Sequence, residues 1–113
     1  MSQDKWQFYR PTIGTSSPAK RELQKLSGTV RGEVLAAMSR VSKDLPPRPP
    51  ECPQQVAVRC FTVPAQSTNV HVLWASLQRH NILVVLHFTT SDAQCPPPAA
   101  YQLARSRLDD VAA

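Results

Sequence analysis

Three cysteines and three histidines are the residues of this chain that could bind a metal or carry out redox chemistry. Cys52, Cys60 and Cys95 form an odd set without close pairs, whereas a secreted disulfide scaffold uses an even and denser set. The short Cys-x-x-Cys and His-x-x-x-His spacings that zinc sites use do not occur in the sequence. We therefore expect free thiols in a reducing cytoplasm, and neither a metal nor another cofactor.

Arginine and histidine offer a second kind of chemistry. Arginine holds phosphate oxygens with parallel donors, and histidine transfers protons near neutral pH. Arg59, His71 and His87 lie in three successive β-prone runs. Each also has an ordinary interpretation: Arg59 as a solvated or ion-paired strand residue, and His71 as a half-buried structural histidine. His87 shares strand parity with Leu83 and Val85, which favours a packed side chain.

The net charge of +5, from 13 Lys and Arg residues against 8 Asp and Glu residues, favours an anionic partner through long-range attraction. Lys20, Arg21 and Lys25 form the basic face of an expected helix, and Arg79 stands in an expected turn. Ordinary solubilising charge is the alternative interpretation. We expect neither a signal peptide nor a membrane span, because apolar runs such as Ile82–Leu86 are far shorter than the ~20 residues that cross a bilayer.

Hydrophobic periodicity predicts the element order β-α-α-β-β-β-α. The first half carries apolar residues at three- and four-residue steps, and the second half consists of β-branched runs separated by short polar joins. The expected elements are a strand at 6–10, helices at 18–26 and 30–43, strands at 55–63, 70–77 and 82–88, and a helix at 99–111. A proline-rich connector, Pro46–Pro53, joins the halves. We predict a single α+β domain over residues 1–113, with a helical hairpin packed on a small antiparallel sheet.

Five local patterns occur in the same order as these elements. Lys5–Arg10 opens the chain, Ser17-Pro18 precedes the first helix, and Ala104–Asp110 closes the last helix. Val56–Arg59 stands where the RelE/ParE toxin superfamily commonly has L-x-E-L-R, and Val70–Trp74 where it has aromatic-R-V-L-aromatic. Through these patterns, which span nearly the whole chain, the sequence resembles that superfamily and its HigB-like branch in particular.

The resemblance implies a toxin of a type II toxin–antitoxin system that cleaves translated mRNA on the ribosome without a metal. In that reaction the 2′-hydroxyl attacks the adjacent phosphate, so one concave face must transfer protons and stabilise negative charge. Arg59 would clamp the phosphate, and His71 would act as acid, base or charge stabiliser. His87 would partly replace basic residues that family members carry after the last strand. The residues that would contact RNA are Lys20, Arg21, Lys25 and Arg79.

The segment after the last expected strand departs from the family. Members commonly carry lysines and a tyrosine there, whereas Phe88–Pro96 contains neither. This favours a second interpretation, a binding protein on the same scaffold without nuclease activity, such as a gyrase inhibitor or a regulatory partner. In either case we expect a cytoplasmic protein bound by an antitoxin with acidic, amphipathic segments. The toxin assignment as a whole rests on Arg59 and His71 sharing one open face of the sheet, and opposite faces would overturn it.

Overall fold

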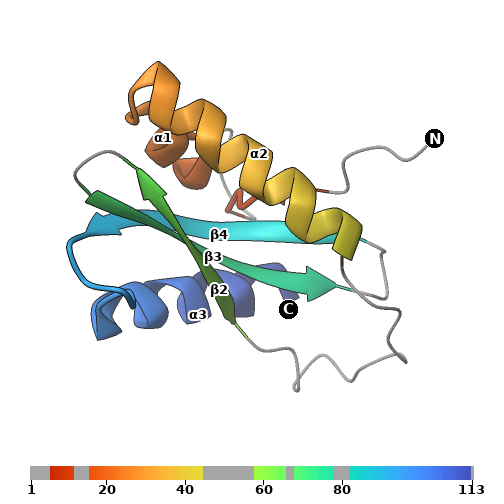
Figure 1. Cartoon of the computed structure of the whole chain (residues 1–113). Helices are drawn as coiled ribbons and strands as arrows, with labels where there is room; N and C mark the ends of the chain where they lie inside the picture. The colour runs from red at the N-terminus through yellow and green to blue at the C-terminus, as the bar shows by residue number, and fades with distance from the viewer. Residues whose placement is uncertain (1–5, 12–15, 45–57, 66–67, 78–81, 113) are drawn as a thin grey trace.

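The computed structural model describes residues 6–11, 16–44, 58–65, 68–77 and 82–112. Within them the chain follows the predicted β-α-α-β-β-β-α order (Figure 1). The elements are β1 (Trp6–Phe8), α1 (Pro18–Gln24), α2 (Gly28–Asp44), β2 (Arg59–Ala65), β3 (Thr68–Leu77), β4 (Ile82–Ser91) and α3 (Pro98–Ala112). The predicted α+β class is therefore confirmed. No helix in these ranges is long and apolar enough to cross a membrane.

The four strands form one sheet in the order β1-β4-β3-β2. β2, β3 and β4 are antiparallel neighbours, as two successive hairpins require. β1 runs parallel to β4, with Trp6–Phe8 beside Leu83–Val85. The prediction of an antiparallel sheet is therefore wrong for its first strand, and the sheet is mixed. A parallel pair is possible here because the chain between β1 and β4 is long and passes through two helices, and parallel strands need such a crossover.

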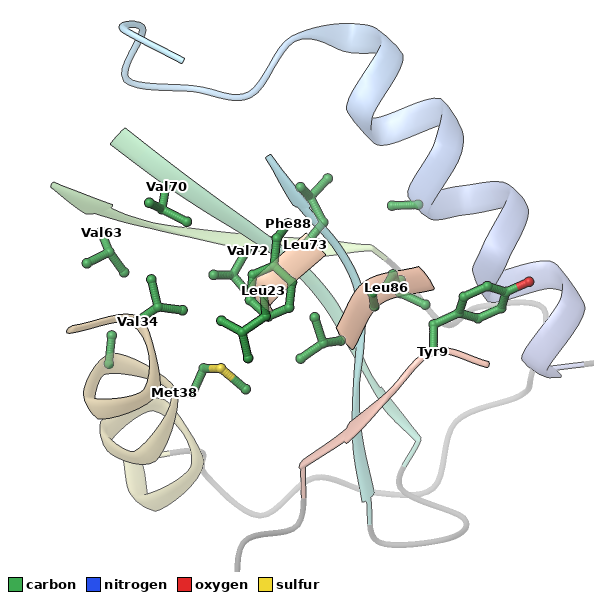
Figure 2. Packing of buried hydrophobic residues seen from close by; sticks show 14 of the residues in the cluster. Tyr9, Leu23, Val34, Met38, Val63, Val70, Val72, Leu73, Leu86 and Phe88 are labelled. Carbon is green, nitrogen blue, oxygen red and sulfur yellow. The ribbon is translucent and has the colours of Figure 1, made fainter. Parts of the chain in front are cut away.

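Helices cover both faces of the sheet. α1 and α2 lie on one face and α3 lies on the other (Figure 1). Figure 2 shows Val34 and Met38 of α2 facing Val63, Val70 and Val72 of the sheet, and these five residues are buried. The predicted helix pair on a sheet is thus present, and the third helix adds a layer that the sequence had not assigned to a face. We call the two sides the α2 face and the α3 face.

Two serines fix the starts of the first helices. The hydroxyl of Ser17 accepts a hydrogen bond from the amide of Lys20 at 3.2 Å and donates to the carbonyl of Tyr9 at 2.6 Å, so it caps α1 and ties it to the end of β1. The proline that follows stands at the first helical position, as predicted. Ser27 accepts from the amide of Val30 at 3.3 Å and so caps α2. The helix begins at the next residue, Gly28, two residues before the predicted start.

The strand boundaries differ more than the helix boundaries. β2 occupies Arg59–Ala65 instead of 55–63, and β4 continues three residues beyond the predicted end, to Ser91. Arg59 is consequently the first residue of its strand. The part of the predicted strand at 55–57, the connector Pro46–Pro53 and Arg79 lie outside the described residues.

Candidate functional site

The two principal candidate residues, Arg59 and His71, point to opposite faces of the sheet. In the β2–β3 hairpin Arg59 stands opposite Trp74 and Thr62 stands opposite His71. Directly opposed residues of an antiparallel pair share a face, and successive residues of a strand alternate between faces. Arg59 therefore shares the α2 face with Trp74, and His71 shares the α3 face with Thr62. The prediction that Arg59 and His71 line one open face is wrong.

Arg59 stacks on a buried aromatic ring. Its guanidinium carbon lies 5.7 Å from the centre of the Trp74 ring, within the range of a cation–π contact. Trp74 is only 5% exposed, whereas Arg59 is partly exposed. The Trp74 ring also contacts Trp6 edge-to-face, with ring centres 5.5 Å apart. Trp74 is therefore a core residue, and Arg59 lies where this part of the core meets solvent.

His71 is fully buried, and both of its ring nitrogens have partners. Nδ1 lies 2.9 Å from the hydroxyl of Thr62 and Nε2 lies 2.7 Å from the hydroxyl of Ser91. The hydroxyl of Thr62 donates to the carbonyl of Gln94, so it accepts from Nδ1–H. The hydroxyl of Ser91 accepts from the amide of Ala93, so its own proton is available for Nε2. Each donor in this series of hydrogen bonds therefore has an acceptor when His71 is neutral.

This arrangement disfavours the protonated form of His71. Burial lowers the pKa of His71 below its usual value, because a charged ring loses its hydration. His71 is thus a neutral structural histidine that holds the end of β4 and the following turn against β2 and β3. Its ring has no exposed surface for an RNA hydroxyl or phosphate.

His87 belongs to a third, separate group of contacts. Its Nδ1 lies 2.9 Å from a carboxylate oxygen of Glu22 in α1, and Arg107 of α3 binds the other oxygen of the same carboxylate at 3.1 Å. All three side chains are at most one-fifth exposed. We call these three residues the edge cluster. The sequence did not predict Glu22 or Arg107, and no local signal could reveal them because the partners lie 65 to 85 residues apart.

The edge cluster replaces a strand along part of β4. β1 pairs only with Leu83–Val85, so beyond that point no strand among the described residues lies on the same side of β4. There Glu22 accepts from the amide of Phe88 at 3.0 Å, and Arg107 donates to the carbonyl of Leu86 at 2.7 Å. These bonds satisfy backbone groups that would otherwise be unpaired. The register also shifts next to Leu86, so that His87 and Val85 face opposite sides of the sheet, contrary to the parity argument.

The electrostatics of the edge cluster favour the ionised carboxylate. Burial alone would raise the pKa of Glu22, but the hydrogen bonds from His87, the amide of Phe88 and Arg107 outweigh it and lower the pKa. The guanidinium of Arg107 also lies 5.3 Å over the ring of Tyr9. Arg107 therefore contacts an aromatic ring, a carboxylate and a backbone carbonyl.

The predicted RNA contacts on α1 are exposed. Lys20, Arg21 and Lys25 all lie on the surface: Lys20 in the first turn of this short helix, Arg21 in its last turn and Lys25 just after its end. Lys20 lines a groove of about 500 Å³ beside β1 together with Arg10, which the sequence reasoning did not single out. Because β1 and β2 are opposite edges of the sheet, this basic surface and Arg59 lie at opposite edges.

Comparisons with known proteins leave the family open. Neither a scan against protein-family models nor a search of curated proteins found a match to this chain. The geometry of the site therefore carries the functional argument. It divides the three predicted catalytic residues among three sets of contacts that share no member: Arg59 with Trp74, His71 with Thr62 and Ser91, and His87 with the edge cluster.

Proposed function

We propose that the protein is a binding protein on a RelE/ParE-type scaffold, which acts by occupying a macromolecular target and does not cleave mRNA. One observation carries this proposal: the three residues that would supply the cleavage chemistry face different partners. Arg59 and His71 lie on opposite sides of the sheet, and His87 contacts Glu22. Of the two interpretations that the sequence allows, this separation favours the binding protein.

Cleavage by a 2′-hydroxyl needs a base, an acid and positive charge within hydrogen-bond reach of one phosphate. His71 has both ring nitrogens engaged and no exposed surface. His87 bonds to a carboxylate that also binds Arg107, so the positive charge of that arginine is already compensated. The remaining candidate, Arg59, stacks on Trp74 and could hold an anion, but it forms none of the ion pairs between described residues.

The exposed basic surface supports binding to an acidic partner. Arg10, Lys20, Arg21 and Lys25 are exposed, and Glu22, the acidic residue of α1, points inward to the edge cluster. Positive charge that its own protein does not neutralise attracts an oppositely charged surface and accelerates association. In this proposal the protein is cytoplasmic, an acidic antitoxin binds it, and gyrase, the target of ParE-type members, is the first target to examine.

Two assays test the proposal on the full chain. In a coupled translation reaction we expect no new 5′ ends within mRNA codons, and His71→Gln and Arg59→Ala leave the mRNA equally intact. In a supercoiling assay with purified gyrase, we expect inhibition that increases with the molar ratio of the protein to gyrase and does not depend on incubation time. Cuts within codons that disappear in Arg59→Ala would overturn the proposal and establish the nuclease. Intact mRNA together with uninhibited gyrase would exclude gyrase as the target.

A further inference from the structure

The thiol of Cys60 lies between the sheet and α3. Arg59 points to the α2 face, and successive residues of a strand alternate, so Cys60 points to the α3 face. Its side chain is half-buried. Burial raises the pKa of Cys60, and hydrogen bonds, including one with the hydroxyl of Tyr101 in α3, partly offset that rise. Cys60 and Tyr101 are therefore in contact across the two layers.

The turn after β4 is fastened to the β2–β3 hairpin just before Cys95. The side-chain amide of Asn69 donates to a carbonyl of this turn at 2.9 Å, and the hydroxyl of Thr62 donates to the carbonyl of Gln94 at 3.4 Å. Thr62 is two residues from Cys60 on β2 and shares its face. The backbone immediately before Cys95 is therefore held beside the strand that carries Cys60.

Two thiols and a phenol meet where this turn enters α3. Cys95 is exposed, and Tyr101 stands in the first turn of α3, which begins at Pro98. Burial raises the pKa of Tyr101, and so do the negative charges of the Cys60 and Cys95 thiolates. A Cys95 thiolate also adds to the rise in the pKa of Cys60 that burial causes. Such effects fall with distance, so the three side chains form one group, which we call the thiol cluster.

We propose that Cys60 and Cys95 are a modification site, a pair of thiols that hydrogen peroxide oxidises to a reversible disulfide. The contact between Gln94 and Thr62 brings the two backbones together next to the cysteines, as a disulfide requires. In a reducing compartment such bonds are transient and serve redox sensing. The site is independent of the proposed function, because it shares no residue with the edge cluster or with the basic surface of α1.

The reaction proceeds in two steps. The Cys95 thiolate attacks one oxygen of the peroxide, so that an S–O bond forms, the O–O bond breaks, and hydroxide leaves and takes up a proton to become water. This sulfur is oxidised by two electrons as the peroxide is reduced. The Cys60 thiolate then attacks the same sulfur, the S–S bond forms and the S–O bond breaks. The departing hydroxide takes up the proton that Cys60 released, so two thiols and one peroxide give one disulfide and two waters.

The surroundings of the two thiols assign their roles. Peroxide reaches Cys95 first because Cys95 is exposed, whereas Cys60 is half-buried and burial raises its pKa. The hydroxyl of Tyr101 stabilises the Cys60 thiolate, which is the attacking form in the second step. Tyr101→Phe is therefore expected to slow disulfide formation by up to about tenfold, since raising a pKa by one lowers the thiolate fraction tenfold. Gln102→Ala, at the exposed neighbouring position, leaves the rate unchanged.

Tryptic digestion detects the bond directly. The full chain carries Cys52→Ser, so that this third thiol, which lies outside the described residues, does not compete. Trypsin leaves Cys60 in the peptide 60–79 and Cys95 in the peptide 80–105. The folded protein is exposed to hydrogen peroxide, remaining thiols are blocked with N-ethylmaleimide, and the digest is examined by mass spectrometry. We expect the two peptides to be joined with the loss of two hydrogens, and dithiothreitol to separate them.

Single variants in the same background test the order of the steps. In Cys60→Ser we expect Cys95 to accumulate as a sulfenic acid that dimedone traps. In Cys95→Ser we expect Cys60 to remain a thiol over the same time. In concentrated urea the disulfide of the parent protein forms roughly tenfold more slowly, because the fold no longer holds the two thiols together.

Three results would overturn the site. They are the absence of the joined peptide after oxidation, a joined peptide that occurs only in a covalent dimer, and a rate that urea leaves unchanged. Dimedone trapped on Cys60 in place of Cys95 would reverse the proposed order and refute the assigned roles. The joined peptide is measured without substitution at either cysteine, so a variant that fails to fold does not affect it.

Discussion

Two arginines at opposite edges of the sheet differ in what surrounds them. Arg107, beside β4, stacks on Tyr9 and binds the carboxylate of Glu22 and a backbone carbonyl. Arg59, at the start of β2, stacks on Trp74 and forms none of the ion pairs within the described ranges. Arg107 bonds to a backbone carbonyl of β4 that β1 does not reach, whereas Arg59 has no such role in the sheet.

The difference separates structural charge from charge that can serve a ligand. A partly buried ion pair is strongly destabilised when one partner is removed, because the other charge stays uncompensated. When an arginine contacts only an aromatic ring, its truncation lowers the free energy of unfolding by little. The comparison therefore predicts opposite sensitivities for two residues of the same type, and mutation can measure them.

Glu22→Ala is expected to have the largest effect on stability, equalled only by that of Arg107→Ala. The change removes the acceptor of the amide of Phe88, the partner of His87 and the counter-charge of Arg107 at once. We expect the free energy of unfolding to fall by about 3 kcal/mol, the lower end of the range for breaking a buried ion pair, because the cluster keeps some solvent contact. Urea denaturation followed by circular dichroism measures the loss.

Glu33→Ala is the matched control, because Glu33 is an exposed glutamate on α2. Its substitution is expected to change the free energy of unfolding by no more than about 0.5 kcal/mol. Equal losses for the two variants would show that the edge cluster carries no special energy, and the contrast between the two arginines would disappear with it.

The sequence predicted the elements well because their signals are local. The cap at Ser17 and the alternating runs of the second half depend on neighbouring residues, and the structure has every predicted element in the predicted order. The parallel pairing of β1 with β4 was missed, because nothing in Trp6–Phe8 indicates which strand it joins. Glu22 and Arg107 were missed for the same reason, since only the tertiary fold brings them together.

The error about Arg59 and His71 was avoidable. The predicted strand ends, 63 and 70, pair with each other in the structure, and a hairpin closed at that pair sets Arg59 opposite Trp74. That register alone assigns Arg59 and His71 to different faces, since one residue of slippage exchanges the faces. The family resemblance aligned the motifs of the two strands separately and did not consider their pairing.

His71 provides the second prediction, a loss of stability in mild acid. Its pKa is lowered in the folded protein and has the ordinary value of 6.5 when unfolded, so below that pH the unfolded state binds more protons. The free energy of unfolding therefore falls as the pH drops from 7 to 5, by up to about 1.4 kcal/mol per pH unit. Urea denaturation at a series of pH values measures the slope.

Two features identify His71 as the origin of this slope. His71→Gln is less stable at pH 7 because it breaks the hydrogen bonds through which His71 links Thr62 to Ser91. Its free energy of unfolding nevertheless changes less between pH 7 and 5. Glu22 acts in a different range, because its pKa is lowered from 4.5 and its contribution disappears only as the pH falls below that value. An unchanged slope in His71→Gln would assign the proton uptake to another group.

Arg59→Ala is expected to have the smallest effect on stability. It removes a contact with Trp74 that is worth roughly 0.5–1 kcal/mol at a partly exposed site. Arg107→Ala, its counterpart, is expected to lower the free energy of unfolding by about 3 kcal/mol, since it leaves Glu22 partly buried without its cation. Both values come from the same urea denaturation experiment.

The ratio of these two losses in the free energy of unfolding shows whether Arg59 stabilises the fold or is available to a ligand. A small loss at Arg59 together with a large loss at Arg107 means that the fold does not need the charge on β2. An unneeded and partly exposed charge is then free to hold an anion. If Arg59→Ala instead destabilises the protein as much as Arg107→Ala, Arg59 is a structural arginine.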